Sequence, residues 1–135
     1  MESVPLPAPA GAASDEFAAD AAPLRVLLAE DDPVARLLTT RLLRKAGYEV
    51  IAVADGDAAL ATLRETFCPL LLTDWEMPGL DGPSLLRAVR TGDWPGYVYA
   101  VLLTGRDGRE HVLQGLDAGA DDYLKKPVDE AELVA

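Results

Sequence analysis

The sequence contains a single cysteine, Cys68, so the chain cannot form an internal disulfide. It has only 12 basic residues against 23 acidic ones, and the net charge of −11 argues against a nucleic-acid backbone or an anionic membrane surface as the main partner. No apolar run is long enough to span a membrane, and the first residues lack the basic and apolar regions of a secretory signal. These absences predict a cytoplasmic protein that binds cations or basic protein surfaces and makes no direct contact with nucleic acid or membrane.

The composition is sufficient for one folded domain. Half of the 135 residues are hydrophobic, which allows one ordinary core but not two full domains. Residues 1–22 are rich in alanine and proline and show no sustained apolar period, so we expect a flexible extension there. We therefore expect the domain to occupy residues 23–135.

From residue 24 onward, short apolar runs alternate with segments of helical period. We expect strands at residues 25–29, 48–53, 70–73, 97–103 and 123–125. We expect helices at residues 33–46, 57–66, 83–90 and 109–118, with one more beginning at 129. The first helix carries apolar residues at helical spacing, namely Val34, Leu37, Leu38 and Leu42. This alternation predicts an α/β fold, a doubly wound parallel sheet with helices on both faces.

Polar residues follow the expected strands. Glu30 and Asp31 follow the first strand, Asp74 the third, Thr104 the fourth and Lys126 the last. In a doubly wound sheet these ends share the edge where ligands bind. Carboxylates this close repel one another by roughly 1 to 4 kcal/mol per pair, which a single lysine cannot balance. The pattern therefore predicts an Mg²⁺ site beside an aspartate, Asp74, that can accept a phosphoryl group.

Four segments in this order resemble the receiver domain of two-component response regulators, in particular the chemotaxis-receiver type: VLLAEDDPVAR, TDWEMPGLDG, LLTGRD and ADDYLKKP. The resemblance covers residues 24–135. It implies a flavodoxin-like sheet with strand order 2-1-3-4-5 and a last helix shorter than is usual in the family. It also implies that the chain is not an enzyme but a phosphoacceptor, which assists its own phosphorylation and autodephosphorylation.

The resemblance assigns roles at the site residue by residue. Asp74 would accept the phosphoryl group from a sensor histidine kinase or a histidine phosphotransfer protein. Thr104 and Lys126 would bind the phosphoryl oxygens. The expected ligands of Mg²⁺, or of Mn²⁺ in its place, are Glu30, Asp31, Asp74 and the backbone carbonyl of Glu76.

Further roles concern switching and lifetime. Thr104 and Tyr123 would form a switch pair that remodels a surface read by an output domain, a downstream protein or a second copy in a homodimer. Pro127 would form a cis peptide bond. Glu76 and Arg106 would flank the path of attacking water and slow dephosphorylation, which the dephosphorylation rates of Glu76→Asn and Arg106→Ala would test. By contrast, Asp32 and Asp81 are interpreted as helix caps.

Two other functions remain open from the sequence. A non-phosphorylated pseudo-receiver would bind a partner constitutively on the same fold, and treatment with acetyl phosphate and Mg²⁺ would distinguish it. A phosphohydrolase of the haloacid-dehalogenase type carries a second acid two residues after its nucleophile, where Glu76 stands here. The Met-Pro-Gly turn and the lack of a capping insertion argue against this enzyme, and turnover of an aryl phosphate would test it.

Overall fold

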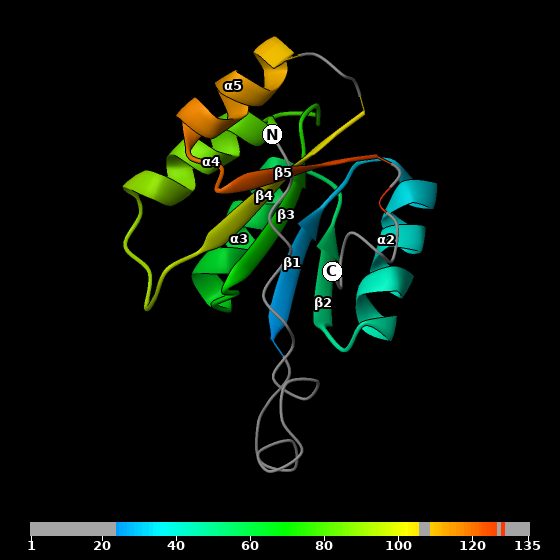
Figure 1. Ribbon diagram of the computed structural model, residues 1–135. Coiled ribbons are helices and arrows are strands. Elements are labelled where there is room, and N and C mark those ends of the chain that lie inside the picture. Colours follow the sequence, from blue (N-terminus) through cyan, green and yellow to red (C-terminus); the bar gives the residue numbers. More distant parts are fainter. Residues whose placement is uncertain (1–23, 106–108, 127, 129–135) are drawn as a thin grey trace.

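Strands and helices alternate through the computed structural model, which describes residues 24–105, 109–126 and 128, with the side chains of 109–113 excepted (Figure 1). The elements are β1 (Arg25–Ala29), α2 (Pro33–Lys45), β2 (Glu49–Val53), α3 (Gly56–Glu65), β3 (Leu70–Asp74), α4 (Gly82–Thr91), β4 (Tyr99–Thr104), α5 (Arg109–Ala118) and β5 (Asp122–Lys125). The predicted extension at 1–22 and the predicted helix at 129–135 lie outside the described residues. No helix within the described ranges has the length and apolar character needed to cross a membrane.

The sheet has five strands, all parallel, in the order β2-β1-β3-β4-β5. This is the order that the resemblance implied, and the fold is flavodoxin-like and doubly wound. Chain order reverses between β1 and β3, which lie side by side at the centre. The carboxyl ends of β1 and β3 therefore border the crevice where such sheets bind ligands.

Helices cover both faces of the sheet, and a separate hydrophobic core lies between the sheet and the helices on each face. On one face α3, α4 and α5 pack over alternate strand residues such as Leu27 and Leu71. On the other face Leu28 and Leu72 point toward α2, whose Leu43 is fully buried. Burial on both faces is why the central strands read as continuous apolar runs rather than as alternating ones.

Helix α2 begins where the sequence predicts. The Asp32 side chain caps it by accepting a hydrogen bond from Ala35 N at 2.7 Å, and Pro33 occupies the first helical position. Asp81 caps α4 in the same way, by accepting a hydrogen bond from Ser84 N at 2.9 Å. Both aspartates thus have the capping role that the sequence indicated.

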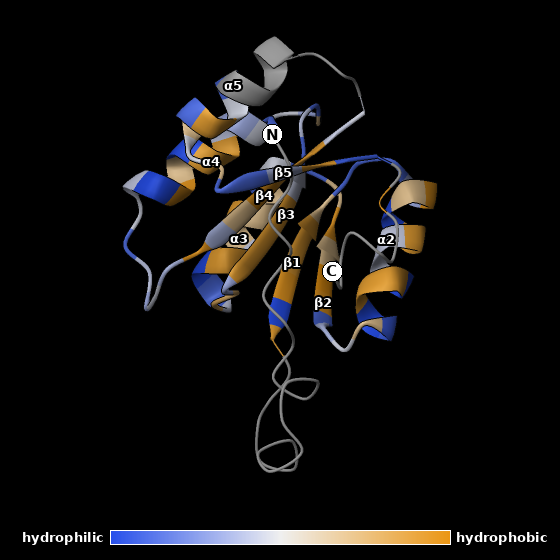
Figure 2. Ribbon diagram, viewed as in Figure 1, coloured by the Kyte–Doolittle hydropathy of each residue, from blue (hydrophilic) through white to orange (hydrophobic). Residues whose placement is uncertain are grey.

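Of the four apolar residues at helical spacing on α2, only Leu42 packs against the core under this helix. Val34 is 63% exposed, Leu37 50% and Leu38 54%, and Figure 2 shows hydrophobic ribbon along this helix. The residues that face the sheet are Thr39, Thr40 and Leu43. The helix carries more apolar residues than one contact with the sheet can cover, so a second apolar face is exposed to solvent.

Thr40→Val is expected to raise the free energy of unfolding by about 1 kcal/mol. Thr40 is buried, and its Oγ1 atom has no hydrogen-bond partner within the described part of the chain, so valine removes an unpaired hydroxyl at nearly constant shape. Urea unfolding measures the change. Thr73→Val is the contrasting variant because the buried Thr73 hydroxyl donates to Asp74 O at 3.0 Å, and this variant should be less stable than wild type. A loss of stability in Thr40→Val would contradict the argument.

Candidate functional site

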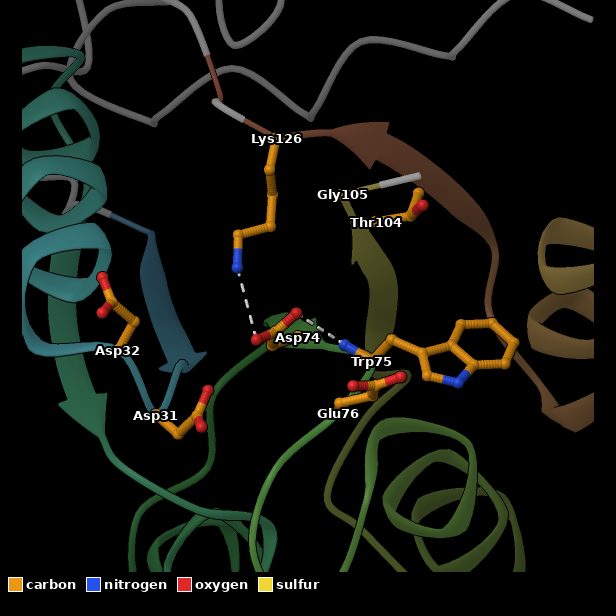
Figure 3. Close-up of a pocket in the computed structure, with 8 residues that line it drawn as sticks. All are labelled: Asp31, Asp32, Asp74, Trp75, Glu76, Thr104, Gly105 and Lys126. Carbon is orange, nitrogen blue, oxygen red and sulfur yellow. Dashed lines mark hydrogen bonds and ion pairs between the residues drawn. The ribbon is translucent and has the colours of Figure 1, made fainter. Parts of the chain in front are cut away.

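A pocket of about 350 Å³ opens at the carboxyl ends of the strands. Figure 3 shows the side chains that line it. Four of the five residues that the sequence placed at this edge line it. The lining residues are Asp31, Asp32, Asp74, Trp75, Glu76, Thr104, Gly105 and Lys126. The fifth predicted residue, Glu30, is buried and reaches the pocket through Lys126. The structure therefore brings these five residues together.

Three carboxylates form the acidic side of this pocket. One oxygen each from Glu30, Asp31 and Asp74 lies within 4.8 Å of the other two. The Glu30 side chain is 1% exposed and that of Asp74 13%, whereas Asp31 faces solvent. Negative charges at this spacing repel one another, more strongly where burial removes water.

Lys126 is the cation in contact with two of these acids. Its Nζ atom lies 2.7 Å from Glu30 Oε1 and 3.3 Å from Asp74 Oδ2. Its backbone N–H donates to Thr104 O at 2.7 Å, which fixes the lysine at the end of β4. Burial lowers the pKa of Lys126, but the hydrogen bond with Glu30 and the charges of both acids outweigh it, so its pKa is raised. The lysine therefore remains cationic.

The Asp74 carboxyl is affected both by its burial and by its charged neighbours. Its pKa is raised to about 7, first by burial and then by the hydrogen bond and negative charge of Glu30, against the opposing effect of Lys126. Its Oδ1 atom also accepts a hydrogen bond from Trp75 N at 2.8 Å. A set of three carboxylates, two of them largely shielded from water, with more negative charge than Lys126 balances, fits a hard divalent cation such as Mg²⁺.

The loop after β3 forms one wall of the pocket. Gly79 has a φ of +71°, which lets the Met-Pro-Gly turn reverse the chain. Leu80 N then donates to Asp57 Oδ2 at 3.3 Å, which holds the loop against the start of α3. The loop presents Glu76 at the pocket with its side chain exposed to solvent.

Two residues near the acids were missed by the sequence reasoning. Arg36 Nη1 donates to the backbone carbonyl oxygens of Glu30 at 2.9 Å and Asp31 at 3.4 Å, although the sequence assigned it no role. Trp75 donates its backbone N–H to Asp74, and its ring points away from that carboxylate in Figure 3. Arg36 stands one helical turn after the Asp32 cap, and this position was the only hint in the sequence that it lies near the acids. The hint is weak, because a side chain that bonds to backbone carbonyls produces no recognisable sequence pattern.

The remaining predicted residues lie elsewhere. Tyr123 pairs with Leu102 in the β4–β5 register and packs against the core under α3, α4 and α5, so it does not line the pocket. Arg106 and Pro127 lie outside the described residues. The switch pair, the pair that controls dephosphorylation and the cis peptide bond therefore stay predictions.

Comparison with known proteins identifies the class. Residues 26–135 match the response regulator receiver domain family. A putative response regulator from Chloroflexus aurantiacus superposes with a TM-score of 0.80 at 34% identity, covering 84% of this chain and 93% of that one. The receiver domain of a sensor histidine kinase from Pseudomonas aeruginosa, with a magnesium ion coordinated in its active site cleft, gives a TM-score of 0.74 at 35% identity and covers 81% and 89%.

The chain therefore belongs to the response regulator receiver domain family. Among curated proteins, the transcriptional regulatory protein TrcR of Mycobacterium tuberculosis is 38% identical over 117 residues, which are 87% of this chain and 45% of TrcR. The chain spans about half the length of the curated relatives that it matches.

Proposed function

We propose that the chain is a phosphorylatable receiver that takes a phosphoryl group onto Asp74 from a sensor histidine kinase or a histidine phosphotransfer protein. One observation carries the proposal: the Asp74 carboxylate lies beside Lys126 and close to the carboxylates of Glu30 and Asp31, in a pocket open to solvent. This is the arrangement that phosphoryl transfer to a carboxylate needs, because a cation must neutralise the charge that builds up on the phosphoryl oxygens.

Each residue has a distinct part in the proposed reaction. A carboxylate oxygen of Asp74 attacks phosphorus, the bond between phosphorus and the donor breaks, and the donor leaves with the bonding electrons. Mg²⁺ or Mn²⁺ would supply charge neutralisation, held by Glu30, Asp31, Asp74 and the Glu76 backbone carbonyl. Lys126 pairs with the phosphoryl charge and Thr104 donates its hydroxyl to a phosphoryl oxygen.

A docking surface for the donor lies next to the pocket. A groove of about 710 Å³ runs along α2 and shares Asp32, Gly105 and Lys126 with the acidic pocket. The groove includes Val34 and Leu38, which are more than half exposed. A donor protein that covers this apolar surface would bring its phosphorylated histidine to Asp74.

Signal output completes the proposal. Thr104 and Tyr123 act as the switch pair, and the altered surface is read by an output domain, a downstream protein or a second copy in a homodimer. Glu76 and Arg106 slow dephosphorylation. The receiver, at residues 23–135, acts in the cytoplasm without contacting nucleic acid itself, although one relative, MtrA of Mycolicibacterium smegmatis, is named a DNA-binding response regulator. It turns over no external substrate.

Acetyl phosphate tests the proposal without a partner. Incubation with acetyl phosphate and Mg²⁺ is expected to increase the mass of the intact chain by one phosphoryl group, and removal of Mg²⁺ with a chelator should prevent the increase. Mass spectrometry at short times measures the product before hydrolysis. No increase at any time would favour the pseudo-receiver alternative, and continuous turnover of an aryl phosphate would favour the phosphohydrolase.

A further inference from the structure

We infer that Arg36 is a positioning residue for the acids that hold the metal ion, an inference that rests on the proposed function. Arg36 lies in the first half of α2 and does not line the acidic pocket. Its Nη1 atom donates to the backbone carbonyl of Glu30 at 2.9 Å, with a longer contact of 3.4 Å to that of Asp31. Within the described ranges no ion pair joins its guanidinium to either carboxylate. Arg36 therefore acts on the backbone that carries both acids.

This backbone segment is held at both ends. Before it, Glu30 N donates to Val53 O at 3.0 Å, which continues the pairing of β1 with β2. After it, Asp32 caps the N-terminus of α2, and Arg36 N donates to Asp32 O at 2.9 Å. The carbonyls of Glu30 and Asp31 lie beyond the last paired residue of β1, and among the described residues Arg36 donates to both of them. The Arg36 side chain thus ties the start of α2 to the backbone of Glu30 and Asp31.

Asp31 depends most on this restraint. The Glu30 carboxylate is fixed by direct contacts, with Lys126 Nζ at 2.7 Å and Asp32 N at 3.3 Å. No hydrogen bond or ion pair reaches the Asp31 carboxylate from any described residue, and the residue is exposed. Its approach to the other two carboxylates follows from the direction of its own backbone. Releasing that backbone would let Asp31 turn away from the pocket.

Positioning and charge have opposite effects on cation binding. As a permanent positive charge, Arg36 opposes a divalent ion nearby, so its removal would tighten Mg²⁺ binding. As a restraint on a ligand, it favours the ion. Residues that orient metal ligands typically change metal affinity about 10- to 100-fold, so we expect the restraint to dominate. The sign of the change in the Mg²⁺ dissociation constant therefore separates the two roles.

Titration calorimetry of the full chain with Mg²⁺ tests the inference. Arg36→Ala is expected to raise the Kd about tenfold, and Arg36→Lys, which can still donate to one carbonyl, should recover part of the affinity. Arg41→Ala is the matched control, because Arg41 is exposed on the same helix and bonds to neither acid. It should leave the Kd unchanged or slightly lower. Thermal unfolding without Mg²⁺ is measured in parallel, because a merely structural arginine would lower Tm and leave the Kd unchanged.

A folded Arg36→Ala chain with a Kd at or below that of wild type would overturn the inference. If Arg36→Ala does not fold, Arg36→Gln is compared with Arg41→Gln, and equal Kd values for these two variants would overturn it as well. A wild-type chain that binds no Mg²⁺ would reject the proposed function and this inference together. Normal wild-type binding combined with an unchanged Arg36→Ala chain would reject the inference alone.

Discussion

Asp74→Asn is expected to abolish phosphorylation by acetyl phosphate and, without divalent cations, to stabilise the fold by about 1–3 kcal/mol at pH 8. The first effect follows because asparagine has no carboxylate oxygen to attack phosphorus. The second follows because the pKa of Asp74 is raised from 3.8 to about 7 by burial and by Glu30, so its ionised form is disfavoured in the folded state. Asparagine keeps the side-chain shape and removes the charge.

The gain in stability should depend on pH in a defined direction. Between about pH 4 and pH 7 the folded chain keeps a proton on Asp74 that the unfolded chain has released, because the folded pKa is the higher one. The Asp74 contribution to wild-type stability is therefore complete below this window and is lost as the pH rises through it. Urea unfolding of wild type and Asp74→Asn at several pH values should show a difference that widens up to about pH 7 and then stays constant.

Mg²⁺ provides the control for this prediction. Adding the ion at pH 8 should stabilise wild type much more than Asp74→Asn, because one proposed ligand and its charge are missing from the variant. Equal free energies of unfolding for the two chains across the whole pH range would show that ionisation of Asp74 does not destabilise the folded state. Phosphorylation of Asp74→Asn at the wild-type rate would place the phosphoryl group on another residue.

The fold could be predicted because its signals are local. Central strands buried on both faces appear as apolar runs, and aspartates before prolines or glycines mark helix starts, as Asp32 and Asp81 do. Element boundaries differ by up to two residues. β4 was predicted from Tyr97 but begins at Tyr99, since the Tyr97 hydroxyl donates to Asp121 and its ring stacks under Arg90. Contacts between distant segments decide such ends.

For the candidate site, the sequence predicts which acidic residues meet but not all of the contacts that hold them. Parallel strands place their carboxyl ends at one edge, so Asp31 and Asp74 were expected to meet, and the structure brings them within 4.8 Å. The contacts of Arg36 could not be predicted, since a side chain folded back onto backbone carbonyls leaves no spacing to read. The helix α2 has two apolar faces, and the helical period of the sequence does not distinguish them. Val34 lies on the exposed face and Leu43 on the face that meets the sheet, although both fit the same period.

The exposed face of α2 leads to the second large effect. Leu38→Glu is expected to lower the rate of phosphorylation by a sensor kinase about tenfold or more, while phosphorylation by acetyl phosphate stays at the wild-type rate. Leu38 is 54% exposed in the groove beside the pocket, and burying a leucine in an interface contributes roughly 1.5–3 kcal/mol. A small donor such as acetyl phosphate needs only the pocket, whereas a protein donor must cover its surroundings.

The charges of α2 sharpen this prediction. The helix carries no acidic residue, and its cations are Arg36, Arg41, Arg44 and Lys45. In a chain of net charge −11, such a helix would complement a donor surface with an apolar centre and acidic margins. Leu38→Glu therefore removes an apolar contact from the interface and places a negative charge opposite the acidic margin of the donor.

The experiment uses the kinase that phosphorylates wild type fastest in a panel of sensor kinases, and follows transfer of labelled phosphate. Ala61→Glu is the matched control, since it places the same charge at an exposed position on α3, which covers the opposite face of the sheet. If Leu38→Glu is phosphorylated by the kinase as fast as Ala61→Glu, the donor docks on another surface. If both donors fail with Leu38→Glu, the substitution has disturbed the pocket itself, because Asp32 and Lys126 border the groove and the pocket alike.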